Sequence, residues 1–343
     1  MKALGFFENG DLSKMQLFET DIPKPKAGEV LIQLKASAFN HLDIWVRKGL
    51  PGIHLNLPHI SGSDGAGIVA ELGENVHSVK AGDRVAIDPG ICEVEDEFTA
   101  RGERSVSPDF AILGEHLSGT HTEYVVVPEK NLLKIPENIS FELAAASGLV
   151  CMTAWRMLIN RGNLKVGEMV LIVGAGGGVN SVAIQIAKLA GCEVHTITSS
   201  EEKMQKAKSL GADVVLNYKT ESNWVEQLYK LTNKVGYDVV VDNVGKATLQ
   251  TSMRLVKRGG RIVIVGNTRG QFVELDIRYL FGKQISLIGS TMGSHDDYLR
   301  VMQLVFAGKI KPPIHTILPL PQGIEAMRLM EEGEQFGKIV LSR

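Results

Sequence analysis

Hydrophobic and polar positions along the chain follow two successive patterns. Up to about residue 145, short apolar runs alternate with turn residues, and Val30–Lys35 and Gly67–Leu72 are predicted strands. Proline, glycine and aspartate interrupt these runs, as at Pro23–Pro25 and Ala81–Asp83. This pattern predicts an irregular, barrel-like β domain.

From Met169 onward, predicted strands alternate with predicted helices. The strands are Met169–Val173, Glu193–Ile197, Asp213–Leu216, Tyr237–Val241 and Arg261–Val265, and the helices Gly178–Ala190 and Glu201–Leu210 lie between the first of them. Such alternation implies a parallel, doubly wound sheet. A helix over Tyr298–Phe306 and a strand over Gly337–Leu341 follow, and we expect this tail to return to the first domain. The 343 residues exceed one ordinary core, which also predicts two domains.

Composition narrows the range of partners. The chain is 44% hydrophobic and 22% charged, and its net charge of -2 gives no reason to expect a nucleic acid or an anionic membrane. The first ten residues lack the basic head and apolar segment of a signal peptide, and no apolar run approaches the ~18 residues that span a bilayer. Three cysteines, Cys92, Cys151 and Cys192, are too few for a disulfide framework. We therefore expect a cytoplasmic protein.

The strongest chemical signal is the glycine-rich loop that connects a predicted strand to a predicted helix. Glycines at such a turn let the backbone approach a pyrophosphate, and the helix N-terminus adds free amide donors. A tight turn alone would also explain a glycine-rich loop, but the preceding strand, the following helix and the later β-α units supply the required context. The predicted contacts to a dinucleotide are Gly174, Gly176, Gly177, Gly178 and Val179.

This loop and further motifs resemble those of the medium-chain dehydrogenase/reductase superfamily, over essentially the whole chain. The other motifs are Gly62–Gly67, Gly82–Val85, Thr153–Trp155, Leu164–Glu168, Ala187–Gly191, Lys206–Asp213 and Gly337–Val340. The resemblance implies an α/β fold in which a Rossmann doubly wound parallel sheet, residues 149–292, is inserted into a GroES-like β-rich catalytic domain, residues 1–148 plus 293–343. It also implies an active site between the domains. Asn180 stands where many relatives have a third glycine, and we expect it to cost some close packing.

The second predicted strand of the sheet bears on the choice of cofactor. NAD-specific folds place an acid about 20 residues after the loop, but His195–Ser200 ends without one. Ser199 and Lys203 lie where the 2′-phosphate of NADP would bind, although a serine here also caps the next helix. Glu201 and Glu202 would repel a phosphate if they turned inward. We favour NADP, with NAD as the alternative.

By resemblance, further residues contact the nicotinamide cofactor. Val244, Gly266, Asn267 and Ser290 would lie along the nicotinamide and its ribose, and each is alternatively an ordinary turn at the end of a strand. Thr153 would line the cofactor pocket, and His41 matches a position that touches the pyrophosphate in relatives. The remaining members of this cofactor-binding set are Asn243, Thr291 and Lys338.

The zinc ligands of the related alcohol dehydrogenases are replaced in this chain. By resemblance, the catalytic cysteine, histidine and second cysteine fall on Asn40, Ser63 and Leu149, which do not make a Zn²⁺ site. Cys151 is two residues away from the third position and fits better as a small buried hydrophobe. The four cysteines of the structural-zinc lobe fall on Glu93, Asp96, Thr99 and Ser107, with Cys92 one residue out of register. We expect no zinc, although two of the histidines His41, His59, His116 and His121 together with Asp64 would allow a different metal site.

Asn40 and Asp43 resemble the Asn-x-x-Asp of the zinc-free quinone and enone reductases of this superfamily. We predict that the Asn40 amide polarises a substrate carbonyl. Asp43 would brace Asn40 and its loop, because the sequence shows no partner that raises its pKa. Alternatively, both residues form a turn before a helix over Ile44–Lys48.

The expected reaction is hydride transfer from the cofactor to a quinone or an α,β-unsaturated carbonyl compound. One alternative is an alcohol dehydrogenase acting on simple alcohols or aldehydes, and another is a non-catalytic cofactor-binding protein of the crystallin or sensor kind. Lys283–Gly289 should form the last strand of the Rossmann sheet and leave an exposed edge. Relatives pair this strand with its copy, so we expect a homodimer or homotetramer, unless the chain's own helices or tail cover the edge.

Overall fold

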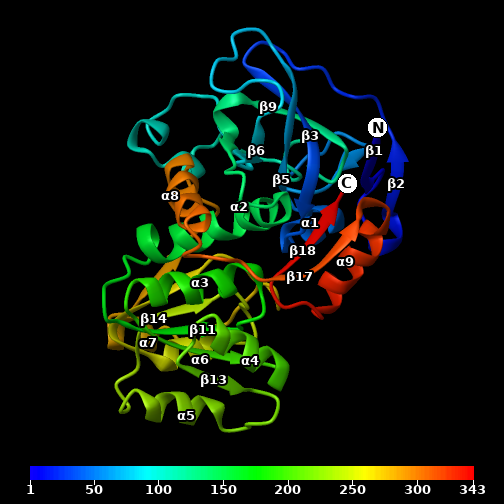
Figure 1. The fold of residues 1–343 in the computed structure, drawn as a ribbon. Helices are drawn as coiled ribbons and strands as arrows, with labels where there is room; N and C mark the ends of the chain where they lie inside the picture. Colours follow the sequence, from blue (N-terminus) through cyan, green and yellow to red (C-terminus); the bar gives the residue numbers. More distant parts are fainter. The chain divides into compact units, whose positions relative to one another are not determined.

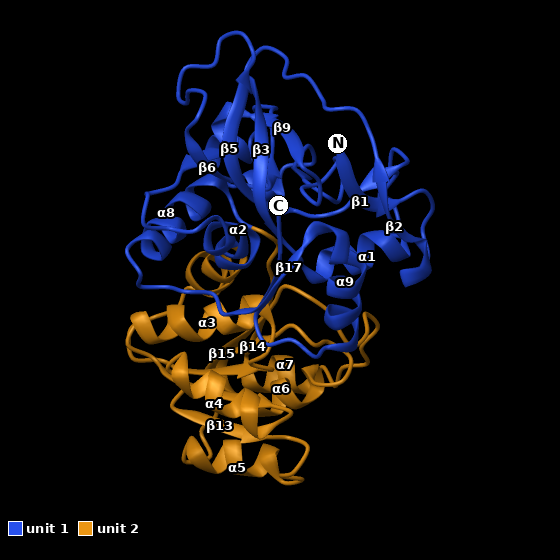
Figure 2. Cartoon of the chain, turned by 45° about the vertical axis from the view of Figure 1, so that its right-hand side comes forward, with its two compact units in different colours: residues 1–152, 293–343 blue, residues 153–292 orange.

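The computed structural model describes residues 1–343, and the chain divides into two compact units. Unit 1 contains Met1–Met152 and Gly293–Arg343, and unit 2 contains Thr153–Met292, as Figure 2 shows in two colours. The boundary expected after residue 148 lies within helix α2 (Phe141–Trp155), and the division in the structure follows Met152. The chain leaves unit 1 in the middle of one continuous helix, so no turn in the sequence marks the boundary.

Unit 1 is built on mainly antiparallel strands with four α-helices (Figure 1). Its strands are β1 (Lys2–Phe6), β2 (Met15–Glu19), β3 (Glu29–Ala38), β4 (His59–Ile60), β5 (Asp64–Leu72), β6 (Arg84–Ile87), β7 (Gly90–Ile91), β8 (Ala111–Ile112), β9 (Tyr124–Pro128), β10 (Leu132–Lys134), β17 (Ile314–Pro319) and β18 (Lys338–Ser342). Its helices are α1 (His41–Lys48), α2, α8 (His295–Phe306) and α9 (Gly323–Glu332). The main sheet has the order β10-β6-β5-β3-β18-β17, with β9 paired to β3.

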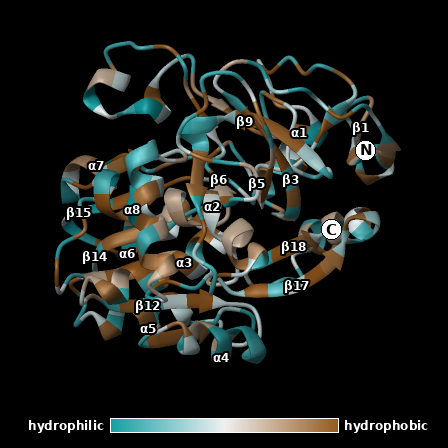
Figure 3. Cartoon of the chain, turned by 45° about the horizontal axis from the view of Figure 1, so that its top comes forward, coloured by the Kyte–Doolittle hydropathy of each residue, from teal (hydrophilic) through white to brown (hydrophobic).

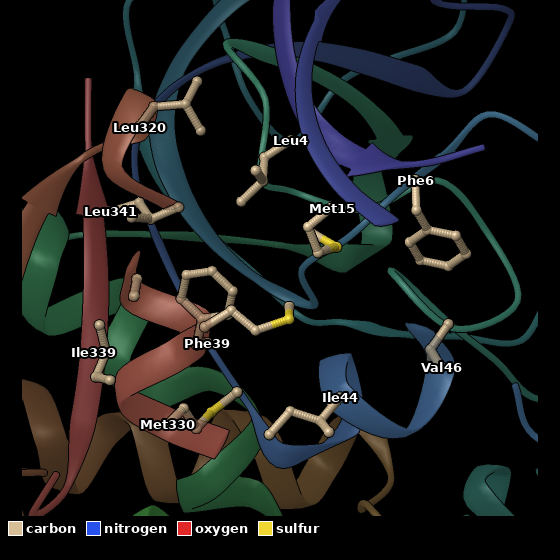
Figure 4. Close-up of a cluster of buried hydrophobic side chains, with 12 residues drawn as sticks. Leu4, Phe6, Met15, Phe39, Ile44, Val46, Leu320, Met330, Ile339 and Leu341 are labelled. Atoms are coloured by element: carbon tan, nitrogen blue, oxygen red, sulfur yellow. The ribbon is translucent and has the colours of Figure 1, made fainter. Parts of the chain in front are cut away.

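The C-terminal strand brings distant parts of the chain together in unit 1. Strand β18 pairs with β3, and Val340 lies opposite Ala38, so the start of β18 lies beside the turn from β3 into α1. An apolar cluster fixes this arrangement, with Phe39, Ile44 and Ile339 among its buried members (Figure 4). Burying each such large side chain contributes about 1.5–3 kcal/mol, which is enough to hold the tail in place.

Unit 2 is a six-stranded parallel sheet with the Rossmann order β13-β12-β11-β14-β15-β16, which confirms the predicted fold class. The strands are β11 (Met169–Val173), β12 (Glu193–Thr198), β13 (Val214–Asn217), β14 (Tyr237–Asp242), β15 (Val256–Ile264) and β16 (Ser286–Gly289). The helices are α3 (Gly178–Leu189), α4 (Glu201–Ser209), α5 (Trp224–Leu231), α6 (Leu249–Leu255) and α7 (Arg278–Lys283). Helix α3 packs on β11 and β12, and α6 packs on β14 and β15. The charged helix α4 is largely hydrophilic (Figure 3).

The segment Phe141–Arg161 corrects one expectation from the sequence. By length and composition it is apolar enough to cross a membrane, although no apolar run of that length was expected. However, 78% of its apolar stretch is buried inside the protein, as in a core helix, so it is weak evidence for a membrane span. Scattered polar residues such as Ser147 and Thr153 hide this continuity in the sequence.

Candidate functional site

The glycine-rich loop of unit 2 forms an open cradle before helix α3. Gly174 has a φ of +89°, a conformation that favours glycine. Gly177 is the N-cap of α3, and a Cβ added there would meet no atom within 4 Å. Gly176 lies in the same turn, while Gly178 and Val179 open the helix. The free amides of the first helical turn and the open backbone fit a dinucleotide pyrophosphate.

Asn180 braces this cradle, which corrects the expectation that it costs close packing. Its Nδ2 donates to the carbonyl oxygens of Val173 (3.0 Å) and Gly174 (2.7 Å). Its Oδ1 accepts from Asn243 Nδ2 (2.7 Å), and Asn243 Oδ1 accepts from the Val265 N–H (2.8 Å). The two asparagines therefore tie the loop to the ends of β14 and β15. The side-chain amide of Asn243, which was expected to contact the cofactor, forms hydrogen bonds within the protein.

Other predicted cofactor residues lie at the same edge of the sheet. Val244 follows β14, Gly266 and Asn267 follow β15, and Ser290 and Thr291 follow β16, at the carboxyl ends where this fold binds ligands. The hydroxyl of Ser290 is buried and has no hydrogen-bond partner.

Thr153 supplies a second unpaired hydroxyl in unit 2. Only 3% of this residue is exposed, and its Oγ1 has no hydrogen-bond partner. Buried hydroxyls normally have partners, so Ser290 and Thr153 retain hydrogen-bonding capacity that polar groups of a dinucleotide can use. Together with the cradle, these observations fit a nicotinamide dinucleotide in unit 2.

Positive charge gathers beyond the end of β12. Ser200 rather than Ser199 caps α4, since its hydroxyl accepts from the Lys203 N–H (3.2 Å). Burial lowers the pKa of the Lys203 ammonium; the charge of Glu202 raises it, and the nearby ammonium groups of Lys206 and Lys219 lower it further. Lys219 was missed in the sequence, although it follows β13, the neighbouring strand in the sheet.

In unit 1, Asn40 lies in the short connection between β3 and α1 and is the N-cap of α1. Its backbone N–H donates to Asp43 Oδ2 (2.7 Å), and the Gly62 N–H donates to Asp43 Oδ1 (2.9 Å). Asp43 is 1% exposed and thus joins the start of α1 to the turn before β5. This geometry agrees with a bracing role for Asp43.

The Asn40 side chain belongs to a buried network with Asp64 and Lys338, which we call the Asn40–Asp64–Lys338 triad. Asn40 Nδ2 donates to Asp64 Oδ2 (2.9 Å), while Lys338 Nζ donates to Asn40 Oδ1 (2.5 Å) and to Asp64 Oδ2 (2.9 Å). The ammonium can only donate, so the amide oxygen must face Lys338 and the NH₂ must face Asp64. The second oxygen of Asp64 accepts from the Leu149 N–H (2.6 Å).

Lys338, predicted to contact the cofactor, has a side chain that is 2% exposed and an ammonium group that is hydrogen-bonded within this triad. The sequence offered no sign of the partnership. His41, the other predicted cofactor residue of unit 1, starts α1, and its ring packs edge-on against Trp45 at 5.1 Å between centroids.

The environment of Asp43 corrects a second expectation. Burial raises the pKa of the Asp43 carboxyl to about 7, against the lowering effect of the N–H groups of Asn40 and Gly62. No charged partner is needed to raise the pKa of Asp43, because the loss of hydration on burial alone disfavours the charged carboxylate. Nearby, burial also lowers the pKa of His121 well below its usual value, so this imidazole is neutral. His121 Nδ1 lies 2.8 Å from Ser37 Oγ, and its Nε2 lies 4.0 Å from Asp43 Oδ2.

The residues at the family's catalytic-zinc positions do not fit the ion. Asn40 is held by an ammonium, Ser63 offers a buried hydroxyl without a partner, and Leu149 is an alkane. No group of three or more His, Cys, Asp or Glu side chains is placed to hold a metal.

The alternative histidine site is not assembled either. His59 Nε2 lies 3.0 Å from the Gly114 carbonyl oxygen, and His116 Nδ1 accepts from the Ile112 N–H (3.2 Å). Like His121, each ring has a hydrogen-bonding partner of its own, the usual state of a structural histidine.

Hydrogen bonds hold the lobe where the family has its structural zinc. Asp96 Oδ1 accepts from the N–H groups of Phe98 and Thr99, both at 2.8 Å, and Thr99 Oγ1 accepts from the Asp96 N–H (2.7 Å). Hydrogen bonds from the Thr99 backbone and the Ser107 side chain are the leading causes that lower the pKa of Asp96. Three of the four positions where the family's cysteines would fall, Asp96, Thr99 and Ser107, are thus joined by hydrogen bonds.

Comparison with known proteins agrees with this architecture. The alcohol dehydrogenase GroES-like domain family matches residues 26–137, and the zinc-binding dehydrogenase family matches residues 178–307. The chain is 34% identical to an NAD-dependent alcohol dehydrogenase of Sulfolobus acidocaldarius (99% of each chain) and 30% identical to a human quinone oxidoreductase (99% of this chain, 97% of the relative). A crystal structure of an NAD-dependent alcohol dehydrogenase covers 100% of both chains at 41% identity and a TM-score of 0.96.

A Rossmann unit with an open pyrophosphate cradle, combined with a GroES-like unit, defines an oxidoreductase that uses a nicotinamide cofactor and a small-molecule substrate. The chain belongs to the medium-chain dehydrogenase/reductase superfamily.

Proposed function

We propose that this protein is a zinc-independent NADPH-dependent reductase of quinones or α,β-unsaturated carbonyl compounds. The observation that carries the proposal is the Asn40–Asp64–Lys338 triad, which puts a fixed amide where zinc-dependent relatives have a metal ligand. Hydrogen-bond donors that are fixed before reaction stabilise a developing oxyanion without zinc.

The triad prepares the Asn40 amide for this role. One N–H of the Asn40 NH₂ group is taken by Asp64, so the second remains for a substrate carbonyl oxygen. Lys338 prevents the amide from flipping, because an NH₂ group facing the ammonium would set donor against donor. The reduced nicotinamide supplies the hydride when the cofactor is bound. Asp43 positions Asn40 through the backbone of the same residue.

Steady-state kinetics with NADPH and a panel of quinones, enones and aldehydes would test the proposal. Asn40→Ala should lower kcat about 10²–10³-fold for the best substrate, as expected when one oxyanion donor is lost. Asn9→Ala is a matched control, because that amide donates instead to the carbonyl oxygens of Val46 and Arg47. An unchanged kcat in Asn40→Ala would contradict the assignment.

The preference for NADP rests on the cationic group at the end of β12. Lys203 and Lys219 supply positive charge near the site expected for a 2′-phosphate, and no acid occupies the end of β12. The relatives named as NAD-dependent support NAD as the competing choice. Titration of both reduced cofactors by fluorescence would decide between them.

The second candidate is an alcohol dehydrogenase of simple alcohols, and the names of several relatives favour it. Oxidation of a primary or secondary alcohol with NAD, faster than any enone or quinone reduction, would establish it. Tight cofactor binding without turnover across both panels would support a non-catalytic role instead.

We also propose a homodimer or homotetramer built through strand β16. This strand lies at the edge of the sheet in unit 2. Leu287, within the strand, is 39% exposed, and Ile277 and Phe281, shortly before it in the sequence, are 64% and 69% exposed. All three cysteines are unpaired and buried, which supports a cytoplasmic location.

A further inference from the structure

Unit 1 contains a second buried network, which we call the Arg343–Ser37–His121 chain, next to Asp43. Arg343 Nη1 donates to Ser37 Oγ (2.9 Å), and Ser37 Oγ lies 2.8 Å from His121 Nδ1. The Nε2 atom of the same imidazole lies 4.0 Å from Asp43 Oδ2. Ser37 and His121 are 0% exposed and Asp43 is 1% exposed, so water does not screen these groups.

The hydrogen-bonding needs of Ser37 decide which nitrogen of His121 carries the proton. A hydroxyl has one hydrogen and two lone pairs, and Arg343 donates to one lone pair. His121 Nδ1 is the acceptor within reach of the hydroxyl hydrogen, and a buried O–H without an acceptor is costly. Ser37 therefore donates to Nδ1, and His121 carries its ring proton on Nε2, the nitrogen nearest Asp43.

Arg343 also holds the backbone on both sides of His121. Its Nε donates to the Thr122 carbonyl oxygen and its Nη2 to the Thr120 carbonyl oxygen, both at 2.8 Å. The guanidinium thus fixes the segment that carries the imidazole. It also occupies carbonyl oxygens that would otherwise compete for the Ser37 hydroxyl.

Packing fixes the imidazole against the two segments that Asp43 joins. The ring of Phe39, the residue before Asn40, lies 4.1 Å from the His121 ring between centroids. Gly62, whose N–H donates to Asp43, has a φ of +99°, and a Cβ there would come within 2.6 Å of His121 Nδ1. The close approach of ring and backbone therefore requires glycine at this position.

The charged groups around His121 and Asp43 are Arg343, Lys338 and Asp64. Burial raises the pKa of Asp43 to about 7, while the charge of Lys338 lowers it and that of Asp64 raises it. Burial and the charges of Arg343 and Lys338 lower the pKa of His121. Above about pH 7, a carboxylate therefore faces a neutral imidazole.

The Nε2–H of His121 has no hydrogen-bond partner. Its distance of 4.0 Å from Asp43 Oδ2 exceeds a hydrogen bond, so the N–H attracts the carboxylate electrostatically. The same Oδ2 atom accepts from the Asn40 N–H (2.7 Å). The attraction thus holds the carboxylate where it fixes the backbone of Asn40, while the triad fixes the Asn40 side chain.

We propose that Ser37 and His121 are positioning residues for the reduction, and that they act on the Asn40 amide through Asp43. Neither side chain contacts the substrate. Their effect on catalysis requires that Asn40 bind the substrate carbonyl, so this role rests on the proposed function.

Nitrogen-15 NMR of histidine-labelled protein tests the chain without turnover, at pH 8, where Asp43 is a carboxylate. The protein has nine histidines, and His121→Phe assigns the signals of His121 by removing them. We expect a protonated Nε2 and an unprotonated Nδ1, and the Nδ1 signal should move in Ser37→Ala because its hydrogen bond is lost. A protonated Nδ1, or an Nδ1 signal that Ser37→Ala leaves in place, would overturn the chain.

Kinetics at the same pH test the positioning role. His121→Phe should lower kcat about tenfold for the best substrate and change KM less than about twofold, because Asn40 is displaced but not removed. In an Asn40→Ala background, His121→Phe should lower kcat no further. His59→Phe is the matched control, since His59 is 2% exposed and lies against the Phe6 ring, but its Nε2 faces the Gly114 carbonyl oxygen.

Ser37→Ala gives a milder version of the same test in case His121→Phe folds poorly. It should lower kcat several-fold, and again have no effect in the Asn40→Ala background. A loss of kcat that is equal in both backgrounds, or that His59→Phe reproduces, would refute the positioning role. Absence of turnover with every substrate would refute the proposed function and this role with it, whereas the NMR signals would still report the hydrogen bonds of the chain.

Discussion

Lys338 and Asp64 form a buried ion pair across 274 positions of the chain, with 2.9 Å between Nζ and Oδ2. The two side chains are 2% and 0% exposed, so water does not screen the pair. Strand β18 carries Lys338 to the start of α1, and β5 carries Asp64 to the same place. The orientation of the Asn40 amide therefore depends on a residue close to the C-terminus.

Removing the charge of Lys338 should both destabilise unit 1 and impair the reaction. Lys338→Met leaves the Asp64 carboxylate buried without its cation, which costs about 3–5 kcal/mol. Urea denaturation would measure this loss, and kcat should fall more than KM rises because Asn40 is no longer held. Lys338→Arg keeps the charge and should restore part of both quantities. Equal stability and kcat in Lys338→Met and the unmodified protein would rule out this role.

The buried Asp43 carboxyl predicts a pH dependence of stability. Its pKa is raised from 3.8 to about 7 in the folded protein, so the folded state holds a proton that the unfolded state releases between these values. The stabilisation is complete below about pH 4 and is lost as pH rises toward 7. Burial also raises the pKa of Glu115 to about 7, which adds a contribution in the same range.

Thermal unfolding from pH 4 to pH 8 would test this dependence. Asp43→Asn and Glu115→Gln should each flatten the curve, and the double variant should flatten it most. Asp43→Asn should also lower stability at every pH, because an amide cannot accept both backbone N–H groups. A slope that persists in the double variant would show that other groups cause it.

Gly177 gives a test of the cradle that leaves the fold intact. A Cβ at this position meets no protein atom within 4 Å, so Gly177→Ala should cost at most about 1 kcal/mol as a poorer N-cap. The added methyl group would occupy the space expected for the pyrophosphate, so NADPH binding should weaken at least about tenfold. Gly282→Ala, also in open space, should leave the Kd unchanged. Equal Kd values for both variants would place the pyrophosphate elsewhere.

The cationic group beyond β12 predicts selective effects on the two cofactors. Lys203→Ala and Lys219→Ala should each weaken NADPH by about 10–100-fold and change NADH binding little, because only NADPH carries the 2′-phosphate. Lys208→Ala, an exposed charge on the same helix as Lys203, serves as the control. Equal losses for NADPH and NADH would remove both lysines from the phosphate site.

Structure that arises from residues close together in the sequence could be predicted, whereas contacts between residues far apart in the sequence could not. The strand-loop-helix at Gly174–Gly178 and the β-α repeat appear as periodicity, so the Rossmann sheet was predictable. The Lys338–Asp64 pair requires knowing that β18 pairs with β3, which no local pattern reveals. The raised pKa of Asp43 likewise depends on burial by distant segments. In the sequence, Asn180 was interpreted only as the replacement of a family glycine, because its hydrogen-bond partner Asn243 lies 63 positions away.

The exposed edge of β16 predicts the assembly of the protein. Strand β16 pairs with β15 on one side only, and Leu287, which pairs in register with Ile262, is 39% exposed. An apolar edge with unpaired backbone groups favours pairing with a second copy about a two-fold axis. Sedimentation at micromolar concentration should therefore detect species larger than the 37.3 kDa chain.

Leu287→Lys should shift the protein toward monomer while its thermal unfolding stays cooperative, because the side chain already faces solvent in one chain. The structure disfavours Ile285→Lys as an equivalent test, since Ile285 is 8% exposed and packs in the core of unit 2, so a lysine there would damage the fold itself. Val235→Lys, at a residue 64% exposed and remote in sequence from β16, should leave the assembly unchanged. An unmodified protein that is monomeric and active would show that the edge is protected in some other way, and the cofactor argument would stand without the dimer.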